Sequence, residues 1–308
     1  MVKSIHRSGL LALQFSSLCL ADNLGLQQIL GALSPLKGWL SSDWNYDTPT
    51  NTGSTPSNTQ SSDFWKPTAG QSWNIQLLKV PDVSAAEDNA YSVWDFDMAL
   101  ASSELINSFH AKGRRVICYF SAGSVEDYRS DAGDFPKEAV GKVMDGWPDE
   151  KWVDVRNQGV RDIMKKRIDE AKSKGCDGVD PDNIDGYQND SGFDMTEDDA
   201  VDFIRFMAQT AHEAGLAYGL KNGDDALVNR VVDVSQWEIN EECVHYKECD
   251  SYRPFIDANK PVFHIEYPDD APDLSVDAFK KQSCSDPDAR GFSTLIKQRD
   301  LTGEAMTC

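Results

Sequence analysis

From about residue 64 to the C-terminal end, one order of apolar and polar segments recurs along the chain. An amphipathic stretch is followed by a small residue, then by a short apolar run, and then by a polar tip. Two clear examples are Ser173-Lys174-Gly175, before the apolar residues around Val179, and Glu213-Ala214-Gly215, before 216–222. Glycine at a helix end adopts the left-handed conformation that closes the helix. The pattern therefore predicts helices that alternate with strands.

Eight apolar runs fit the predicted strands, and each ends in polar residues. They are 73–78, 91–97, 116–121, 176–181, 216–222, 231–240, 262–267 and 292–297. The run at 176–181 stops at Pro181, which cannot donate a hydrogen bond to a central ladder. Asp182 and Asn183 therefore form the tip of this strand.

Two of the intervening segments have the 3.6-residue period of amphipathic helices. Their apolar faces comprise Val160, Ile163, Met164, Ile168 and Ala171 in the first, and Val201, Ile204, Met207, Ala211 and Ala214 in the second. Thr196, with Asp199 three residues later, is a suitable start for the second helix because the two side chains can cap it.

Strands that alternate with helices at this spacing favour a parallel sheet, and eight of them favour a closed barrel. We expect an α/β fold, a single-domain TIM (β/α)8 barrel over residues 64–308. An open doubly wound sheet is the alternative, but no GxGxxG sequence follows the first predicted strand.

The first 63 residues differ in composition from the rest. Residues 1–21 begin with Lys3, His6 and Arg7, continue with a short apolar core and end in Cys19-Leu20-Ala21, which predicts a signal peptide. An uncleaved anchor is the weaker alternative because the apolar core is too short to span a bilayer. Residues 22–63 form an N-terminal segment and a linker rich in Ser, Thr, Pro and Asn. We therefore expect a secreted protein with no membrane attachment after cleavage.

Six cysteines remain after the predicted cleavage, an even number that favours three disulfides in an exported chain. The short separation of Cys243 and Cys249 favours that pair, which leaves Cys118 with Cys176 and Cys284 with Cys308 as the expected remainder. Spacing alone leaves the connectivity open. The chain has no CxxC sequence and its histidines stand singly, so we expect no metal site and no cofactor.

The formal net charge is −21 at pH 7. Nucleic-acid binding would need a basic face, so this charge excludes that class of partner. An acidic surface also serves simple solubility, and it attracts cationic partners over a long range. We expect a monomer.

Candidate chemistry is concentrated at the predicted strand tips. In a TIM barrel the active site lies at the C-terminal ends of the strands. The polar residues at or near these tips are Asp95, Ser121, Glu126, Asp180, Asn183, Lys221, Asn222, Asn240, Glu266 and Tyr267. Any one of them alone reads as a polar loop residue. Together they predict binding of a polyhydroxylated ligand, including a cationic one.

Asp182 and Glu241 are the predicted catalytic pair, because two carboxylates at strand ends suffice for glycoside hydrolysis. One carboxylate attacks or activates water, and the other, kept protonated, delivers a proton to the leaving oxygen. Aromatic residues could stack on sugar rings or could simply fill the core. They are Trp65, Trp73, Tyr119, Tyr128, Trp147, Trp152 and Tyr187.

Other chemistries fit the sequence less well. No GxSxG nucleophile motif is present. Residues 180–186 imitate a calcium loop, but Gly186 falls one position late and Ser191 stands where the loop needs glutamate. A calcium-binding loop is therefore the weak alternative at this position.

Several motifs occur in order along residues 64–300. They are Trp65-Lys66-Pro67, 118–124 with Glu126-Asp127, Gly146-Trp147-Pro148, 175–179 with Pro181-Asp182-Asn183, Gly219-Leu220-Lys221-Asn222, Asn240-Glu241 with Cys243, Glu266-Tyr267, and 291–294. In these motifs the chain resembles glycoside hydrolase family 114, the endo-α-1,4-polygalactosaminidases, particularly the secreted fungal members. It departs from the fungal pattern at Asp180, Tyr128 and Glu242, where glutamate, tryptophan and glutamine are usual.

The resemblance implies a TIM barrel that cleaves α-1,4-linked galactosamine polymers, with Asp182 as nucleophile and Glu241 as acid/base in a retaining mechanism. It also implies a cationic, galactosamine-containing polysaccharide as partner, which gives the acidic charge a purpose. The candidates for pairing with its amines are Asp95, Glu126, Asp180 and Asp185. A catalytically silent secreted barrel that only binds a cationic wall polysaccharide is the alternative function.

Overall fold

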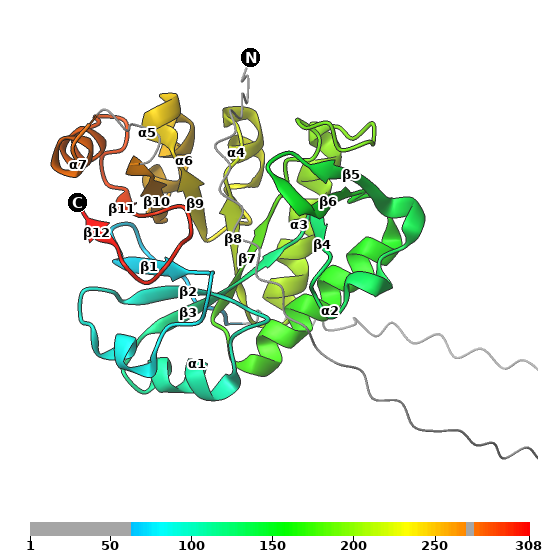
Figure 1. The fold of residues 1–308 in the computed structure, drawn as a ribbon, viewed down its shortest axis with the longest axis horizontal. Coiled ribbons are helices and arrows are strands. Elements are labelled where there is room, and N and C mark those ends of the chain that lie inside the picture. The colour runs from blue at the N-terminus through cyan, green and yellow to red at the C-terminus, as the bar shows by residue number, and fades with distance from the viewer. Residues whose placement is uncertain (1–62, 269–273) are drawn as a thin grey trace, which may run out of the picture. The chain divides into compact units, whose positions relative to one another are not determined.

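Parallel strands dominate the computed structural model, which describes residues 63–268 and 274–308 (Figure 1). Within these residues, eight strands pair in parallel in the order β1, β2, β3, β7, β8, β9, β10 and β11, and the sheet curls toward a closed barrel. Their bounds are β1 Trp73–Gln76, β2 Val93–Asp97, β3 Arg115–Ser121, β7 Gly178–Asp182, β8 Ala217–Lys221, β9 Trp237–Glu241, β10 Val262–Glu266 and β11 Ser293–Ile296. The short β12, Met306–Thr307, adds antiparallel to β11. The expected TIM-like α/β fold is confirmed.

All eight predicted strands are present with shifted bounds, and two of these shifts have a clear cause. The predicted strand 231–240 begins late, because Val231 ends helix α4 (Asp225–Val231) and β9 starts at Trp237. The Asp224 side chain accepts a hydrogen bond from the backbone of Leu227 and so starts this helix. The run 73–78 also shortens, since β1 ends at Gln76 and Leu78 is exposed.

The helices pack against the sheet through the apolar faces that their period predicts. Their bounds are α1 Ser103–His110, α2 Gln158–Lys174, α3 Glu197–Glu213, α5 Cys243–Tyr246, α6 Arg253–Asp257 and α7 Val276–Cys284, with short 3-10 turns at Val83–Glu87, Ala132–Asp134, Lys137–Ala139 and Cys249–Tyr252. The predicted faces of α2 and α3 are buried, except that Ala214 lies just past α3 and is partly buried. The Thr196–Asp199 capping box is confirmed, and Gly175 closes α2 with φ 95°.

A second, small sheet lies between β3 and α2 in the chain and was not predicted. It is antiparallel, in the order β4 (Ser124–Glu126), β6 (Trp147–Val153) and β5 (Val140–Met144) (Figure 1). Glu126 on β4 lies directly opposite Glu150 on β6. Because β4 follows the C-terminal end of β3, this sheet stands beside the mouth of the barrel.

Large aromatic side chains fill the lower part of the barrel. Trp73 and Phe263 stack with ring centroids 4.9 Å apart, and Trp237 lies against Gly178 and Gly219 on the two preceding strands. A β-carbon at Gly219 would lie 2.0 Å from the indole nitrogen of Trp237. The indole therefore fits only because two neighbouring strands have no side chain at these positions.

The seam between β11 and β1 is bridged chiefly by side chains. The Trp73 indole donates to the Ser293 carbonyl at 2.7 Å, and the Ser293 hydroxyl donates to the Gln71 carbonyl at 2.7 Å. The buried Lys297 ammonium donates to the Asn74 side chain at 2.9 Å and to two carbonyls of the loop that follows β11. These bonds hold the first and last parallel strands together.

Three disulfides join the expected pairs: Cys118 with Cys176, Cys243 with Cys249, and Cys284 with Cys308. The first ties β3 to the entrance of β7. No helix in residues 63–268 or 274–308 is long and apolar enough to cross a membrane. The predicted signal peptide and nearly all of the predicted linker lie outside the described residues.

The packing of Trp237 generates a stability prediction. Gly219→Ala should lower the free energy of unfolding by about 3 kcal/mol or more, because the new methyl group overlaps the buried indole. Gly133→Ala is the matched control, since a β-carbon there meets no atom within 4 Å. Urea denaturation of the two variants measures the difference. Equal midpoints would show that Trp237 does not occupy the space above Gly219.

Candidate active site

Three charged side chains from consecutive strands meet at the mouth of the barrel: Asp182 at the end of β7, Lys221 at the end of β8 and Glu241 at the end of β9. The Lys221 Nζ lies 3.2 Å from Asp182 Oδ2 and 3.4 Å from Glu241 Oε2. Lys221 itself is buried, while the two carboxylates are partly exposed to solvent. One ammonium group thus holds both predicted catalytic carboxylates in a single cluster.

Asp182 is held from several sides. Its Oδ2 also accepts a hydrogen bond from the Tyr119 hydroxyl at 3.1 Å, and its Oδ1 accepts from the Asn183 backbone at 2.7 Å. The Asp182 carbonyl accepts from the backbone nitrogens of Ala122 and Gly123 at 2.8 and 3.1 Å. A β-carbon at Gly123 would lie 1.6 Å from the Asn183 carbonyl oxygen, so this close approach requires glycine.

Glu241 is held just as closely. The Tyr267 hydroxyl donates to Oε1, and the Asn222 side chain donates to Oε2 at 3.4 Å. Burial alone would raise the pKa of Glu241, but the charge of Lys221 and the bonds from Tyr267 and Asn222 outweigh burial and lower the pKa. Glu241 is therefore ionised in the free site.

Each of the three charged strand ends is followed by a residue in the left-handed region. Asn183 has φ 61°, Asn222 has φ 51° and Glu242 has φ 69°. A non-glycine residue in this region costs about 1–3 kcal/mol and persists where surrounding contacts enforce it. The turns send the backbone away immediately after the charged residue, which leaves each charged side chain at the mouth.

Asp95 and Asp180 lie below this cluster, inside the barrel, and both have no exposed surface. Burial raises the pKa of Asp95 well above its usual range and, against the opposing charge of Lys221, raises the pKa of Asp180 to about 7. Burial thus favours the protonated form of both acids. Their depth places them beneath the mouth, so neither is positioned to contact a substrate, contrary to our expectation.

Three other residues expected to bind substrate are also buried away from the mouth. Trp73 is 1% exposed and packs in the core. Glu266 accepts a hydrogen bond from the Val244 backbone at 2.7 Å and contacts His264 at 2.9 Å. Asn240 accepts from the Cys243 backbone at 3.1 Å. These polar contacts support the loop after β9.

The loop after β7 holds the remaining predicted residues. Tyr187 is half-buried and accepts a hydrogen bond from the Gln188 side chain at 2.7 Å. Asp185 accepts from Asn189 at 3.0 Å. Residues 180–186 do not form the calcium loop that their sequence resembles, because the first of them, Asp180, points into the barrel interior and not into the loop.

Sequence reasoning missed Glu150, which comes to the mouth on β6. The Ser124 hydroxyl donates to Glu150 Oε2 at 2.8 Å, and Ser124 in turn contacts the Ser121 hydroxyl at 2.5 Å. The Asn183 side chain donates to Ser121 at 2.9 Å. Burial raises the pKa of Glu150 to about 7; the nearby Glu126 and Asp182 also raise it, while the bond from Ser124 lowers it. Residues 147–153 contain a proline and a polar run, so no strand signal in the sequence indicated this residue.

One cluster of side chains combines two cysteines and a histidine, the residue types of many metal sites. In the described residues, the sulfurs of Cys243 and Cys249 and a nitrogen of His264 lie within 4.8 Å of one another. The two sulfurs form a disulfide, so they are not the thiolates that zinc needs.

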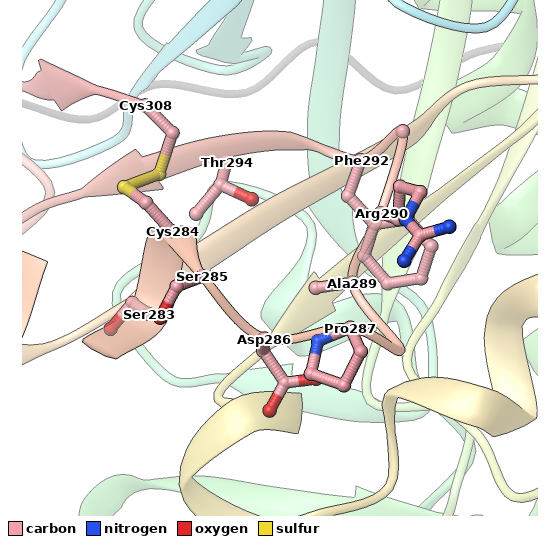
Figure 2. A pocket seen from close by; sticks show the side chains of 11 residues that line it. Ser283, Cys284, Ser285, Asp286, Pro287, Ala289, Arg290, Phe292, Thr294 and Cys308 are labelled. Atoms are coloured by element: carbon pink, nitrogen blue, oxygen red, sulfur yellow. A yellow bond between two sulfur atoms is a disulfide. The ribbon is translucent and has the colours of Figure 1, made fainter. Parts of the chain in front are cut away.

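A cavity of about 320 Å³ lies beside the Cys284–Cys308 disulfide (Figure 2). It adjoins the start of β11, at the end of the sheet opposite to the mouth.

Comparisons with known proteins agree with this fold and show the family. The model of glycoside-hydrolase family GH114 matches residues 54–308. The crystal structure of Aspergillus fumigatus Ega3 in complex with galactosamine is 41% identical, covers 80% of this chain and 98% of its own, and has a TM-score of 0.75. The glycoside hydrolase domain of PelA from Pseudomonas aeruginosa is 14% identical, with 77% and 98% coverage and a TM-score of 0.58, and shows a shared fold. A search of curated proteins gave no match.

Because the family model spans the whole barrel and the relative from Aspergillus fumigatus covers most of the chain, the protein belongs to glycoside-hydrolase family GH114.

Proposed function

We propose that this enzyme is an endo-acting hydrolase of α-1,4-linked galactosamine polymers, including partly deacetylated galactosaminogalactan, and that Asp182 and Glu241 carry out the reaction. The observation that carries the proposal is the pair of carboxylates from β7 and β9 that share Lys221 at the mouth. A relative with 41% identity was crystallised with galactosamine, which supports the choice of sugar.

The separation of the two carboxylates supports a retaining mechanism. The two Lys221 distances added together set the largest possible gap between the oxygens that share it. That upper limit lies at the low end of the range for inverting enzymes, about 6.5–9.5 Å, and above the roughly 5–5.5 Å of retaining enzymes. This limit excludes most of the inverting range and is compatible with the shorter separation of retaining enzymes.

In this mechanism Asp182 Oδ attacks the anomeric carbon and forms a glycosyl ester. Glu241 gives its proton to the leaving oxygen as the glycosidic bond breaks. Water then attacks the same carbon and gives a proton to Glu241, and Asp182 leaves as the carboxylate. Two inversions restore the original configuration. Lys221 lies close to both carboxylates and balances their negative charges, so neither carboxylate has to move between the two steps.

The acid must be protonated when it acts, although Glu241 is ionised in the free site. Bound sugar displaces the water that reaches Glu241, whose side chain is 26% exposed, and this desolvation favours the protonated form. The reaction should therefore favour acidic pH. We also propose that the enzyme acts outside the cell, since its three disulfides are typical of oxidising compartments.

Substitution of the pair tests the reaction. Asp182→Asn and Glu241→Gln should each lower the release of oligosaccharides from deacetylated galactosaminogalactan by about 10³-fold or more, because each removes one chemical role. Mass spectrometry of the supernatant measures release, and circular dichroism checks folding. Wild-type protein that binds the polymer without new reducing ends would instead support the silent binding barrel.

The roles of the two carboxylates can be separated with an activated substrate. A nitrophenyl glycoside of galactosamine has a leaving group that needs no proton, so Glu241→Gln should keep most of its first-step rate while Asp182→Asn should not. Stopped-flow measurement of nitrophenol release gives that rate. The opposite result would exchange the two roles.

Lys221→Met should change the pH profile as well as the rate. Lys221 faces Asp180, Asp182, Glu241 and the ring of Tyr119. Removal of its charge raises the pKa of Glu241, so the decline of kcat/KM on the alkaline side should move upward by about 1 pH unit or more. Lys221→Arg, which keeps the charge, is the control. An unmoved profile in Lys221→Met would mean that Lys221 does not set the ionisation of Glu241.

A further inference from the structure

Of three carboxyl groups buried beside the mouth, those of Asp97 and Glu126 are paired with a guanidinium group, and the third is the exception. Arg129 lies 2.6 Å from Asp97 and 2.7 Å from Glu126, and the Tyr128 hydroxyl also donates to Glu126. Nearby, Arg167 lies 2.8 Å from the partly exposed Asp131. These pairs satisfy the rule that a charge leaves water only with a partner of opposite sign. Glu126, which we expected to bind substrate, is thereby already neutralised.

Glu150 is the exception. Only 9% of the residue is exposed, yet no lysine, arginine or histidine of the described chain forms an ion pair with it. Its Oε2 accepts the hydrogen bond from Ser124, and its Oε1 accepts none from the described residues. A buried carboxyl group of this kind either keeps a proton or takes a cation from outside the chain.

The surroundings of Glu150 connect it to the site of reaction. Ser121 pairs with Asp182 across the β3–β7 ladder, and the Asn183 side chain donates to the hydroxyls of Ser121 and Ser124 at 2.9 and 3.3 Å. Ser124 then orients Glu150. The same hydroxyl network thus fixes Glu150 and the turn that follows Asp182, so a sugar unit near Asp182 lies beside Glu150.

We propose that Glu150 is the recognition site for the free ammonium group of a galactosamine unit bound next to Asp182, and so selects deacetylated over N-acetylated polymer. This inference rests on the proposed substrate class. An ammonium group supplies the cation that Glu150 lacks, whereas an uncharged acetamide does not. Glu126, across the ladder, cannot serve in this way because Arg129 already occupies it.

The buried position of Glu150 makes its preference for the amine depend on pH. The charged groups near Glu150 are Glu126, Asp182 and Arg129, and burial with the two acids raises the pKa of Glu150 to about 7. Only the ionised form attracts an ammonium group. The preference for the amine should therefore increase as pH rises through about 7, for as long as the amine stays charged.

Equilibrium binding tests the proposal directly. The probes are a galactosamine oligosaccharide and its fully N-acetylated counterpart, titrated by calorimetry into Asp182→Asn protein, which binds without turnover, with and without Glu150→Gln. Glu150→Gln should weaken binding of the amine form about 10- to 100-fold and leave the acetylated form nearly unchanged, as expected for one charge-assisted bond. Glu138→Gln, an exposed site just before β5, is the matched control and should change neither.

Two further measurements distinguish recognition of the amine from a structural role of Glu150. Glu150→Asp keeps the charge and should recover part of the amine preference, which a merely structural residue would not do. The preference should fall between pH 7 and pH 5.5, where the amine stays charged, in Asp182→Asn protein, and it should stay flat when Glu150→Gln is added. An unchanged amine preference in Glu150→Gln would overturn the proposal. Failure of wild-type protein to cleave the polymer would overturn the proposed function, while the binding ratio would still judge Glu150.

Discussion

The ammonium of Lys221 is the contact on which the site depends. It lies within 3.4 Å of carboxylates from both neighbouring strands and above a further buried acid, Asp180. Without it, closely spaced acids would repel one another, and most would take up protons. The placement follows from the sheet. Parallel strands bring their C-terminal ends to one edge, and β7, β8 and β9 are neighbours, so three residues that are distant in sequence meet with no loop rearrangement.

Strand periodicity explains how much of this site the sequence could reveal. Successive residues of a strand face opposite sides, so Asp180 and Asp182 share the inner face, one layer apart. The sequence places both near the tip of the strand, but it does not tell which layer the solvent reaches. The same ambiguity applies to Asn240 and Glu241, where neighbouring polar residues face opposite sides and only Glu241 reaches the mouth. The strands and the meeting of Asp182 and Glu241 at the mouth could therefore be predicted, whereas the depth of Asp95, Asp180 and Glu266 could not.

The small antiparallel sheet was missed for a different reason. Its strands are short, and β6 carries proline and three charged residues, so its sequence resembles a polar loop. Tertiary contacts decide its structure: the turn 121–124 passes so close to Asn183 that Gly123 has no space for a side chain, and this fixes where β4 begins. Once β4 is fixed, the ladder places Glu150 opposite Glu126. The place of Glu150 can be recognised only when the turn 121–124, the turn at Asn183 and β6 are brought together in the fold.

The counter-charge of each carboxylate near the mouth indicates its role. Asp97, Glu126 and Asp131 are paired with arginine, whose fixed charge and planar geometry suit a permanent structural bond. Asp182 and Glu241 share a lysine, a compact charge that balances two acids without a fixed pairing to either. Glu150 has a serine hydroxyl and no cation, and an uncompensated carboxyl group is costly to bury. That cost is offset when the ligand brings the missing charge. Structure, reaction and selectivity can therefore occupy one acidic mouth, because the acids fall into three groups: those paired with arginine, the two that share a lysine, and Glu150, which has no ion-pair partner among the described residues.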